Sequence, residues 1–162
     1  MHVQQSWADN WNDIYCTKLY GDTELKDMML IPSNNYNKLA VFRDRYFVKG
    51  ATADELIKDE KVRIIYYEEK GYKFGNPKVN LKYMTFDIYV KKDCQYTVDS
   101  EDGMRSRPEM IAQKLKEILV PGNHQSKYVC RMRFDFVDSY DMPTKVVGYT
   151  RYHVIFSYKI TV

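Results

Sequence analysis

VNLKYMTFDIYVKK, residues 79–92, is the stretch that decides the fold, because apolar side chains occupy every second position from Met84 to Val90. The apolar set is Met84, Phe86, Ile88 and Val90. The other set is Tyr83, Thr85, Asp87 and Tyr89. A period of two places the sets on opposite faces of a strand, so the pattern predicts a strand of an antiparallel sheet with one buried face.

Three further runs extend the sheet, and one helix accompanies it. The runs are 62–69 (VRIIYYEE), 127–137 (KYVCRMRFDFV) and 148–162 (GYTRYHVIFSYKITV). Apolar residues at helical spacing predict a helix over 107–119, where Ser106 and Glu109 have the spacing of a capping box. The order strand–strand–helix–strand–strand indicates an α+β fold. We expect a mostly antiparallel sheet of four to five strands, with one main helix packed on one face.

The region before residue 61 is expected to be an N-terminal helical extension of this core. Apolar spacing predicts helices from Trp7 to Leu19 and from Thr23 to Leu30, and 39–48 is expected to be an extra extended segment. Segments 93–106 and 138–145 are expected to be polar loops. With no repeat or linker, 1–162 is predicted to be a single domain, with 1–60 as the extension and 61–162 as the core.

Composition limits the class of protein. The net charge is +3, with 7 basic and 10 acidic residues in 1–60, and 18 basic and 12 acidic residues in 61–162. Fifteen tyrosines favour a protein interface, although tyrosine also suits strands. Three cysteines without metal or disulfide spacing, no signal pattern and no long apolar run predict synthesis in the cytoplasm and no membrane association.

Asp87 raises the question of catalysis. Together with Glu68-Glu69-Lys70 on the neighbouring strand it could form a metal-dependent nuclease site, because carboxylates hold Mg²⁺. Its same-face neighbours Thr85 and Tyr89 instead suit a solvated or protein-contact face, which is the interpretation we adopt. A small nuclease remains an alternative hypothesis.

Other chemistry has weaker support. Cysteine catalysis would require Cys94 or Cys130 beside His124 or His153, but Cys130 fits a buried position and Cys94 lies in an acidic loop. The histidines lack the spacing of zinc ligands, and no glycine-rich phosphate loop is present. No catalytic residue, metal or cofactor is therefore predicted.

Basic residues mark the polar faces of the last two runs. They include Arg131, Arg133 and Arg151, with Tyr128 and Tyr149 nearby. A nucleic-acid-binding surface, a protein contact and a solvated sheet face are three open interpretations of this pattern. The candidate subunit-interface or polar-face residues are Tyr83, Asp87, Tyr89, Arg131, Arg133 and Arg151.

The core resembles the tail-terminator, or tail-completion, proteins of tailed bacteriophages. The resemblance rests on element order and on the segments VRIIYYEE, LKYMTFDIYVKK, RPEMIAQKLKEIL, YVCRMRFDFVDSY and VVGYTRYHVIFSYKI. Residues 1–60 exceed what such a protein needs, so a head–tail adaptor or stopper is an alternative within the neck.

The resemblance implies a structural virion protein without enzymatic activity or cofactor. It implies a homo-oligomeric ring, expected to be a hexamer, that ends the tail tube and joins it to the head. The implied partners are the tail tube protein and head-side connector proteins, and contact with DNA would be passing and nonspecific.

Overall fold

The computed structural model describes residues 7–50, 60–69, 79–99, 103–120 and 134–161. No helix in these ranges has the length and apolar character needed to cross a membrane.

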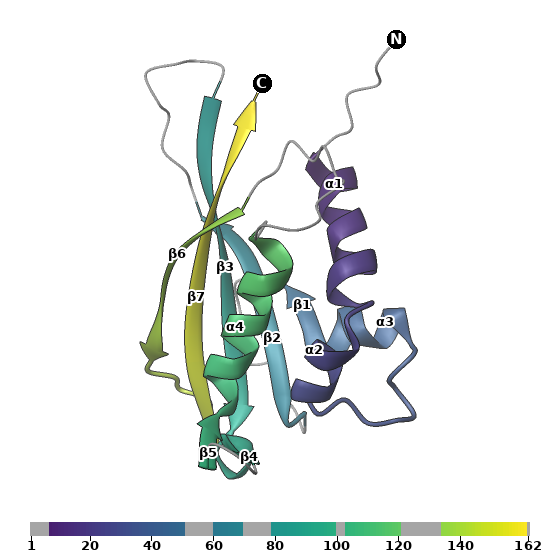
Figure 1. The fold of residues 1–162 in the computed structure, drawn as a ribbon, viewed down its shortest axis with the longest axis vertical. Helices are drawn as coiled ribbons and strands as arrows, with labels where there is room; N and C mark the ends of the chain where they lie inside the picture. The colour runs from purple at the N-terminus through teal and green to yellow at the C-terminus, as the bar shows by residue number, and fades with distance from the viewer. Residues whose placement is uncertain (1–6, 51–59, 70–78, 100–102, 121–133, 162) are drawn as a thin grey trace.

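A five-stranded sheet forms the centre of the molecule (Figure 1). Its strands, in spatial order, are β1 (Phe47–Lys49), β2 (Val62–Glu69), β3 (Val79–Lys91), β7 (Tyr149–Thr161) and β6 (Phe134–Met142). All neighbours are antiparallel except β1 and β2, which are parallel. The predicted α+β fold is confirmed, including the pairing of 62–69 with 79–91.

Helix α4 (Arg107–Leu119) packs on one face of the sheet, as its apolar spacing predicts. Ile111, Leu115 and Leu119 are buried against it. Ser106 occupies the N-cap position, but its side chain makes no capping hydrogen bond, so the predicted capping box does not form. Pro108 lies in the first turn of α4, where backbone N–H groups have no partner within the helix. Because proline has no N–H, it favours a helix start at this position.

The N-terminal segment is helical and belongs to the same core. It contains α1 (Trp7–Asp13), the π-helical segment η1 (Ile14–Leu19), α2 (Thr23–Met28), α3 (Leu39–Val41) and the π-helical segment η2 (Phe42–Tyr46). The ring of Trp11 lies 5.3 Å from that of Tyr66 on β2 and 6.1 Å from that of Phe134 on β6, measured between centroids. The Tyr15 hydroxyl donates to the Phe47 carbonyl at 2.7 Å.

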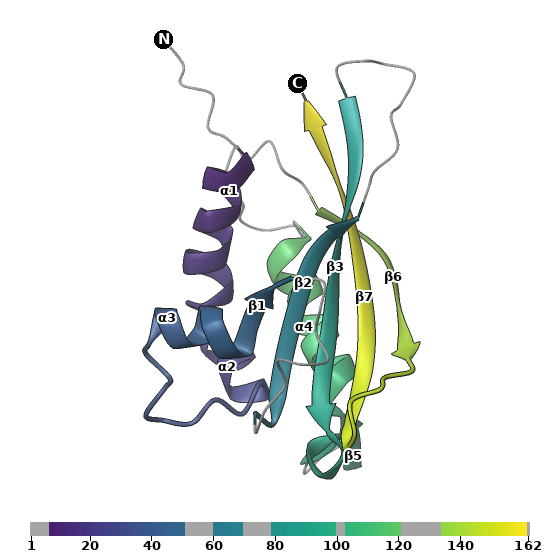
Figure 2. The ribbon, with the colours of Figure 1, turned by 180° about the vertical axis from the view of Figure 1, so that it is seen from behind.

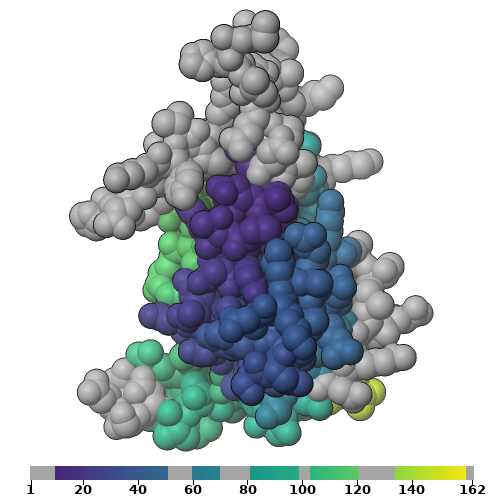
Figure 3. Space-filling model, turned by 90° about the vertical axis from the view of Figure 1, so that its right-hand side faces the viewer, coloured from purple at the N-terminus to yellow at the C-terminus, as the bar shows by residue number. Residues whose placement is uncertain are grey.

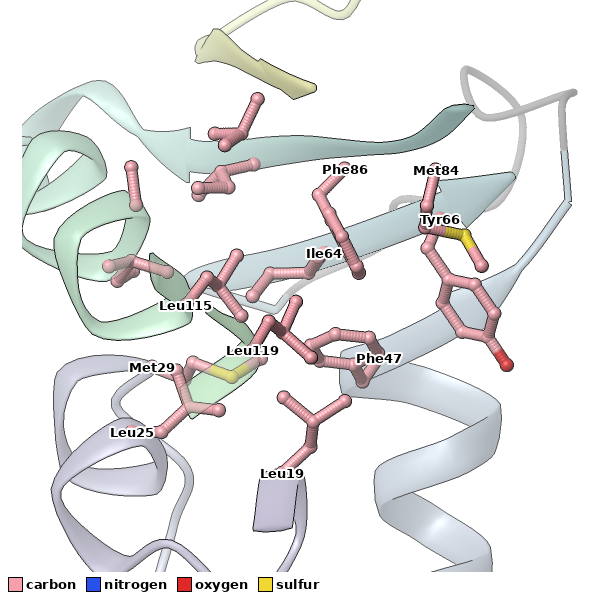
Figure 4. Close-up of a cluster of buried hydrophobic side chains, with 14 of the residues drawn as sticks. Leu19, Leu25, Met29, Phe47, Ile64, Tyr66, Met84, Phe86, Leu115 and Leu119 are labelled. Carbon is pink, nitrogen blue, oxygen red and sulfur yellow. The ribbon is translucent and has the colours of Figure 1, made fainter. Parts of the chain in front are cut away.

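The largest apolar cluster lies between the sheet and these helices. Figure 4 shows side chains from three parts of the chain meeting there, with Leu19 and Met29 facing Phe47, Ile64 and Leu115. All five of these side chains are fully buried. Burial of each such side chain stabilises the fold by about 1.5–3 kcal/mol before entropy losses, so the N-terminal helices contribute substantially to the core.

Three local expectations are wrong. Residues 39–46, expected to be extended, are helical, and only 47–49 form a strand. The expected loop 93–106 contains η3 (Lys92–Cys94) and a hairpin of β4 (Tyr96–Asp99) and β5 (Gly103–Ser106). The expected loop 138–145 is strand as far as Met142, because β6 continues past a bulge between Phe136 and Asp138. Such a bulge inserts one extra residue and interrupts the alternation that marks a strand.

Candidate functional sites: a buried charge cluster and two exposed surfaces

The second face of the sheet carries a buried charge cluster made by Asp87, Arg151 and His153 (Figure 2 shows this face). Asp87 on β3 lies directly opposite His153 on β7 in the strand register. Its Oδ1 is 2.5 Å from His153 Nδ1, and its Oδ2 accepts a hydrogen bond of 2.8 Å from Arg151 Nη2. Because a carboxylate only accepts hydrogen bonds, Nδ1 of His153 carries the proton.

Electrostatics keep Asp87 ionised. Burial alone would raise the pKa of Asp87, but hydrogen bonds from His153 and Arg151, together with the charge of Arg151, lower it below its ordinary value. Burial also acts to lower the pKa of Arg151, and its bond to Asp87 outweighs this and raises it. Burial, followed by the neighbouring Asp87 carboxylate, raises the pKa of Tyr67 to about 12. The cluster is therefore a stable ion pair with a histidine attached.

The Asp87–His153 pair resembles the base and orienting acid of a catalytic triad, but the described residues bring no nucleophile to it. Within the described ranges, no serine, threonine or cysteine side chain hydrogen-bonds to His153. The Thr85 hydroxyl is buried on the same face and has no hydrogen-bond partner. The Tyr140 ring packs against the His153 ring at 5.2 Å between centroids. The arrangement suits a structural role.

The nuclease hypothesis required Asp87 and the Glu68-Glu69 pair to converge, and the sheet separates them. Glu68 pairs with Met84 and accepts a hydrogen bond from the Tyr158 hydroxyl, so it points to the helix side of the sheet. Glu69 shares the face of Asp87 but lies four residues beyond Asp87's partner Ile65, about 13 Å along the strand. The described residues contain no group of three or more His, Cys, Asp or Glu side chains able to hold a metal ion. Lys70 lies outside the described ranges.

The cysteine hypothesis gains no geometric support. Cys94 packs against the helix-side core, whereas His153 lies on the opposite face. Burial, with a contribution from Asp93, raises the pKa of the Cys94 thiol, which makes the thiolate less available. Cys130 and His124 lie outside the described ranges.

The expected polar face of β3 exists, but it is not solvated. Asp87 is 2% exposed and Tyr89 is 1% exposed, while Tyr83 and Arg151 are half-buried. The reason is a second apolar cluster on this face, formed by Ile65, Tyr89 and Tyr149 with Val146 packed against it. The expectation that Asp87 and Tyr89 are available to a partner is therefore wrong for the isolated chain. Arg131 and Arg133 lie outside the described ranges.

Available surfaces lie elsewhere, and the first is β6 at one edge of the sheet. Its exposed apolar residues are Phe136, Val137 and Tyr140. Asp135, Asp138 and Asp141 are also exposed, and β6 contains no basic residue, so its net charge is −3. The sequence pattern does not reveal this surface, because the bulge interrupts the alternation after Phe136.

The second surface is the β4–β5 hairpin at the lower end of the molecule in Figure 1. Val98 pairs with Met104 across the hairpin, and these side chains are 81% and 67% exposed. Tyr96, two residues before Val98, is also exposed. Beside the hairpin, a groove of about 540 Å³ between α2, β5 and α4 is lined by Met28, Met110 and other residues. The only sequence signal was the alternation of Tyr96 and Val98.

No family model matches the chain, and no curated protein matches it.

Proposed function

We propose that this protein is a structural subunit of the neck or tail of a tailed bacteriophage. In this role copies of the chain form a ring that ends the tail tube and joins it to the head. An adaptor or stopper ring of the same neck is the alternative, because all of these rings need the same kinds of surface. The virion is the proposed location.

The observation that carries the proposal is the exposure of large apolar side chains on two separate surfaces. Phe136, Val137 and Tyr140 are 36%, 47% and 43% exposed on β6, and the hairpin exposes Val98 and Met104 further still. Exposed apolar side chains that lie together mark protein contact sites, as Val98 and Met104 do across the hairpin. On β6 the exposed rings lie on both faces of the strand, Phe136 on the face of Phe156 and Tyr140 on the face of His153. A subunit within a ring needs contacts to its neighbours and to the next ring, which two separate surfaces provide.

The fold agrees with the resemblance on which the proposal rests. The resemblance implies a small antiparallel sheet with helices on one side. The sheet of this chain is antiparallel except between β1 and β2 and has α4 and the N-terminal helices on one side, which supports the proposal. In the proposed assembly β6 contacts a neighbouring subunit. The hairpin and its groove contact the tail tube or a head-side connector.

The first test is the absolute mass of the purified protein by light scattering after gel filtration, over a range of concentrations. A mass that corresponds to a closed ring, with rings visible by electron microscopy, is the expected result. A chain that neither forms rings nor binds purified tail tubes would overturn the proposal.

A hairpin variant tests the second contact. Val98→Ser with Met104→Ser removes exposed apolar area while leaving the core unchanged, so rings should still form but bind tail tubes more weakly. The matched control is Val147→Ser, because Val147 is also exposed, at 94%, and belongs to neither surface. Equal tube binding by both variants would remove the hairpin from the proposed contact.

A further inference from the structure

Strand β6 is an edge of the sheet that the described residues form, and it carries a net charge of −3. Among the described residues its only strand neighbour is β7, so the backbone groups on its other side have no partner in the sheet. We call Asp135, Asp138 and Asp141 the acidic edge. All three are exposed, and within the described part of the chain none forms an ion pair. An open edge of this kind readily accepts another chain.

The charge of the acidic edge limits what can bind there. Two copies of β6 placed side by side would bring their carboxylates together, and like charges across a strand pair are destabilising. A symmetric β6–β6 contact is therefore disfavoured. The Phe136 ring already carries the Lys116 ammonium of α4, 3.5 Å from its centroid. The exposed Val137 and Tyr140 would favour association, so the fitting partner is apolar in part and carries basic side chains that meet the three carboxylates.

Such a basic surface lies on the opposite side of the same molecule. We call Lys38, Arg43, Arg45 and Lys49 the basic corner. All four are exposed, and with Asp44 the segment 38–49 has a net charge of +3, equal and opposite to that of β6. This segment runs through α3 and η2 into β1, the other edge strand of the sheet. Figure 3 shows this side of the molecule, where the segment forms the blue surface.

The basic corner is held firmly by the fold. The Arg45 carbonyl accepts a hydrogen bond of 2.6 Å from Nε of buried Arg63, and Arg43 lies over the Tyr15 ring. The Tyr15 hydroxyl also donates to the carbonyl of Phe47, the first residue of β1, and so joins η1 to this strand. The basic corner therefore presents side-chain charges on a rigid base, suited to meeting the acidic edge of another chain.

We infer that the acidic edge of one copy docks on the basic corner of the next copy. The two surfaces differ and lie on opposite sides of the molecule, so the contact is head-to-tail and repeats from copy to copy. Such a contact closes into a ring when the rotation between copies permits it. This inference rests on the proposed ring function and identifies the subunit interface within it.

Charge reversal tests the pairing. One variant carries Asp135→Lys and Asp141→Lys, and the other carries Arg45→Glu and Lys49→Glu. Each variant alone should self-associate at least about tenfold more weakly than the wild type, because like charges then face each other. Sedimentation velocity at low salt measures this. Glu69→Lys with Glu109→Lys is the matched control for self-association, since both residues are exposed and belong to neither the acidic edge nor the basic corner.

Mixing the two variants provides the decisive comparison. In an equimolar mixture, the reversed edge of one variant meets the reversed corner of the other, so association should return to within about threefold of the wild type. If the acidic edge and the basic corner each affected association without contacting each other, the mixture would not recover association. Failure of the mixture to recover would overturn the pairing.

Zero-length cross-linking gives an independent measurement. A carbodiimide joins a carboxyl group to an amine only when the two are in contact. With equal parts of unlabelled and isotope-labelled wild-type chains, mass spectrometry should find mixed-label links between the acidic edge and Lys38 or Lys49. Rings whose mixed-label links lie elsewhere would overturn the pairing and leave the proposed ring function standing. A wild type that stays monomeric at millimolar concentration and gives no links would also overturn the pairing. The binding of the chain to purified tail tubes would then decide the proposed function.

Discussion

At the scale of single residues, Asp87 links the two central strands of the sheet. It is 2% exposed and neutralises Arg151 while bonding to His153, so one carboxylate bonds to two polar side chains. Buried ion pairs contribute little net stability, but removal of one partner leaves an uncompensated charge behind.

We therefore expect Asp87→Asn to lower the free energy of unfolding by about 2–4 kcal/mol, since the amide cannot balance Arg151. Asp138→Asn is the control, because Asp138 is exposed on β6 and its loss should change stability by less than about 1 kcal/mol. Urea unfolding followed by circular dichroism measures both. Equal stability of the two variants would show that the charge cluster is not coupled to folding.

The same carboxylate predicts a dependence of stability on pH. The pKa of Asp87 is lower in the folded chain than in the unfolded chain, so its contribution is complete above the unfolded pKa of about 4. This contribution is lost as the pH falls through the folded pKa. The stability difference between the wild type and Asp87→Asn should hold at pH 5 and shrink towards pH 2.5, as followed by urea titrations. A difference that is constant over this range would contradict the assignment.

The face of Asp87, opposite the main core, was predictable from the sequence, because alternation fixes the face of a strand. The burial of Asp87 was not predictable, since alternation carries no information on what packs against a polar face. The sequence pattern also could not identify His153 as the hydrogen-bond partner of Asp87. That required the register between β3 and β7, which is set by the whole sheet.

At the scale of elements, the first turns of α2 and α4 differ in side-chain capping, and residue spacing does not predict this difference. Asp22 caps α2, with its carboxylate accepting from Leu25 N at 2.8 Å. Ser106 has the spacing of a capping box with Glu109 but makes no side-chain bond to the helix. Sequence spacing states only that a cap is possible.

The difference predicts unequal effects of the same substitution. Asp22→Ala should lower the free energy of unfolding by about 1 kcal/mol, through loss of the cap. Ser106→Ala should lower it by no more than about 0.3 kcal/mol, because no capping bond is lost. Thermal and urea unfolding of the two variants measure the contrast. A cost for Ser106→Ala that matched that of Asp22→Ala would indicate that the serine does cap α4 in solution.

The strands and the main helix were predictable from sequence because each has a strong period and lies against a large apolar core. The failures lie where the period is short or interrupted. The hairpin strands β4 and β5 have four residues each, and β6 is broken by its bulge. Residues 39–46 alternate imperfectly, and their helical form depends on burial of Phe42 and Tyr46 in the shared core. No local signal encodes that burial.

At the scale of the whole molecule, the N-terminal segment and the sheet form one core. Trp11 contacts rings on β2, β3 and β6, and Leu19, Leu25 and Met29 are fully buried in the same cluster. The prediction that 61–162 forms the core and 1–60 its extension therefore becomes a question of whether 61–162 is stable by itself.

We expect Trp11→Ala to lower the free energy of unfolding by about 3–5 kcal/mol, because it leaves a large cavity between α1 and the sheet. Tyr96→Ala, at a ring that is 53% exposed on the hairpin, is the control and should cost less than about 1 kcal/mol. A chain that starts at Gly50 loses α1, α2 and β1 together, which exposes the apolar face of β2. It should show no cooperative unfolding transition by calorimetry. A sharp transition in that shortened chain would mean that 61–162 folds alone, and that the N-terminal helices are free to serve a neighbouring subunit instead.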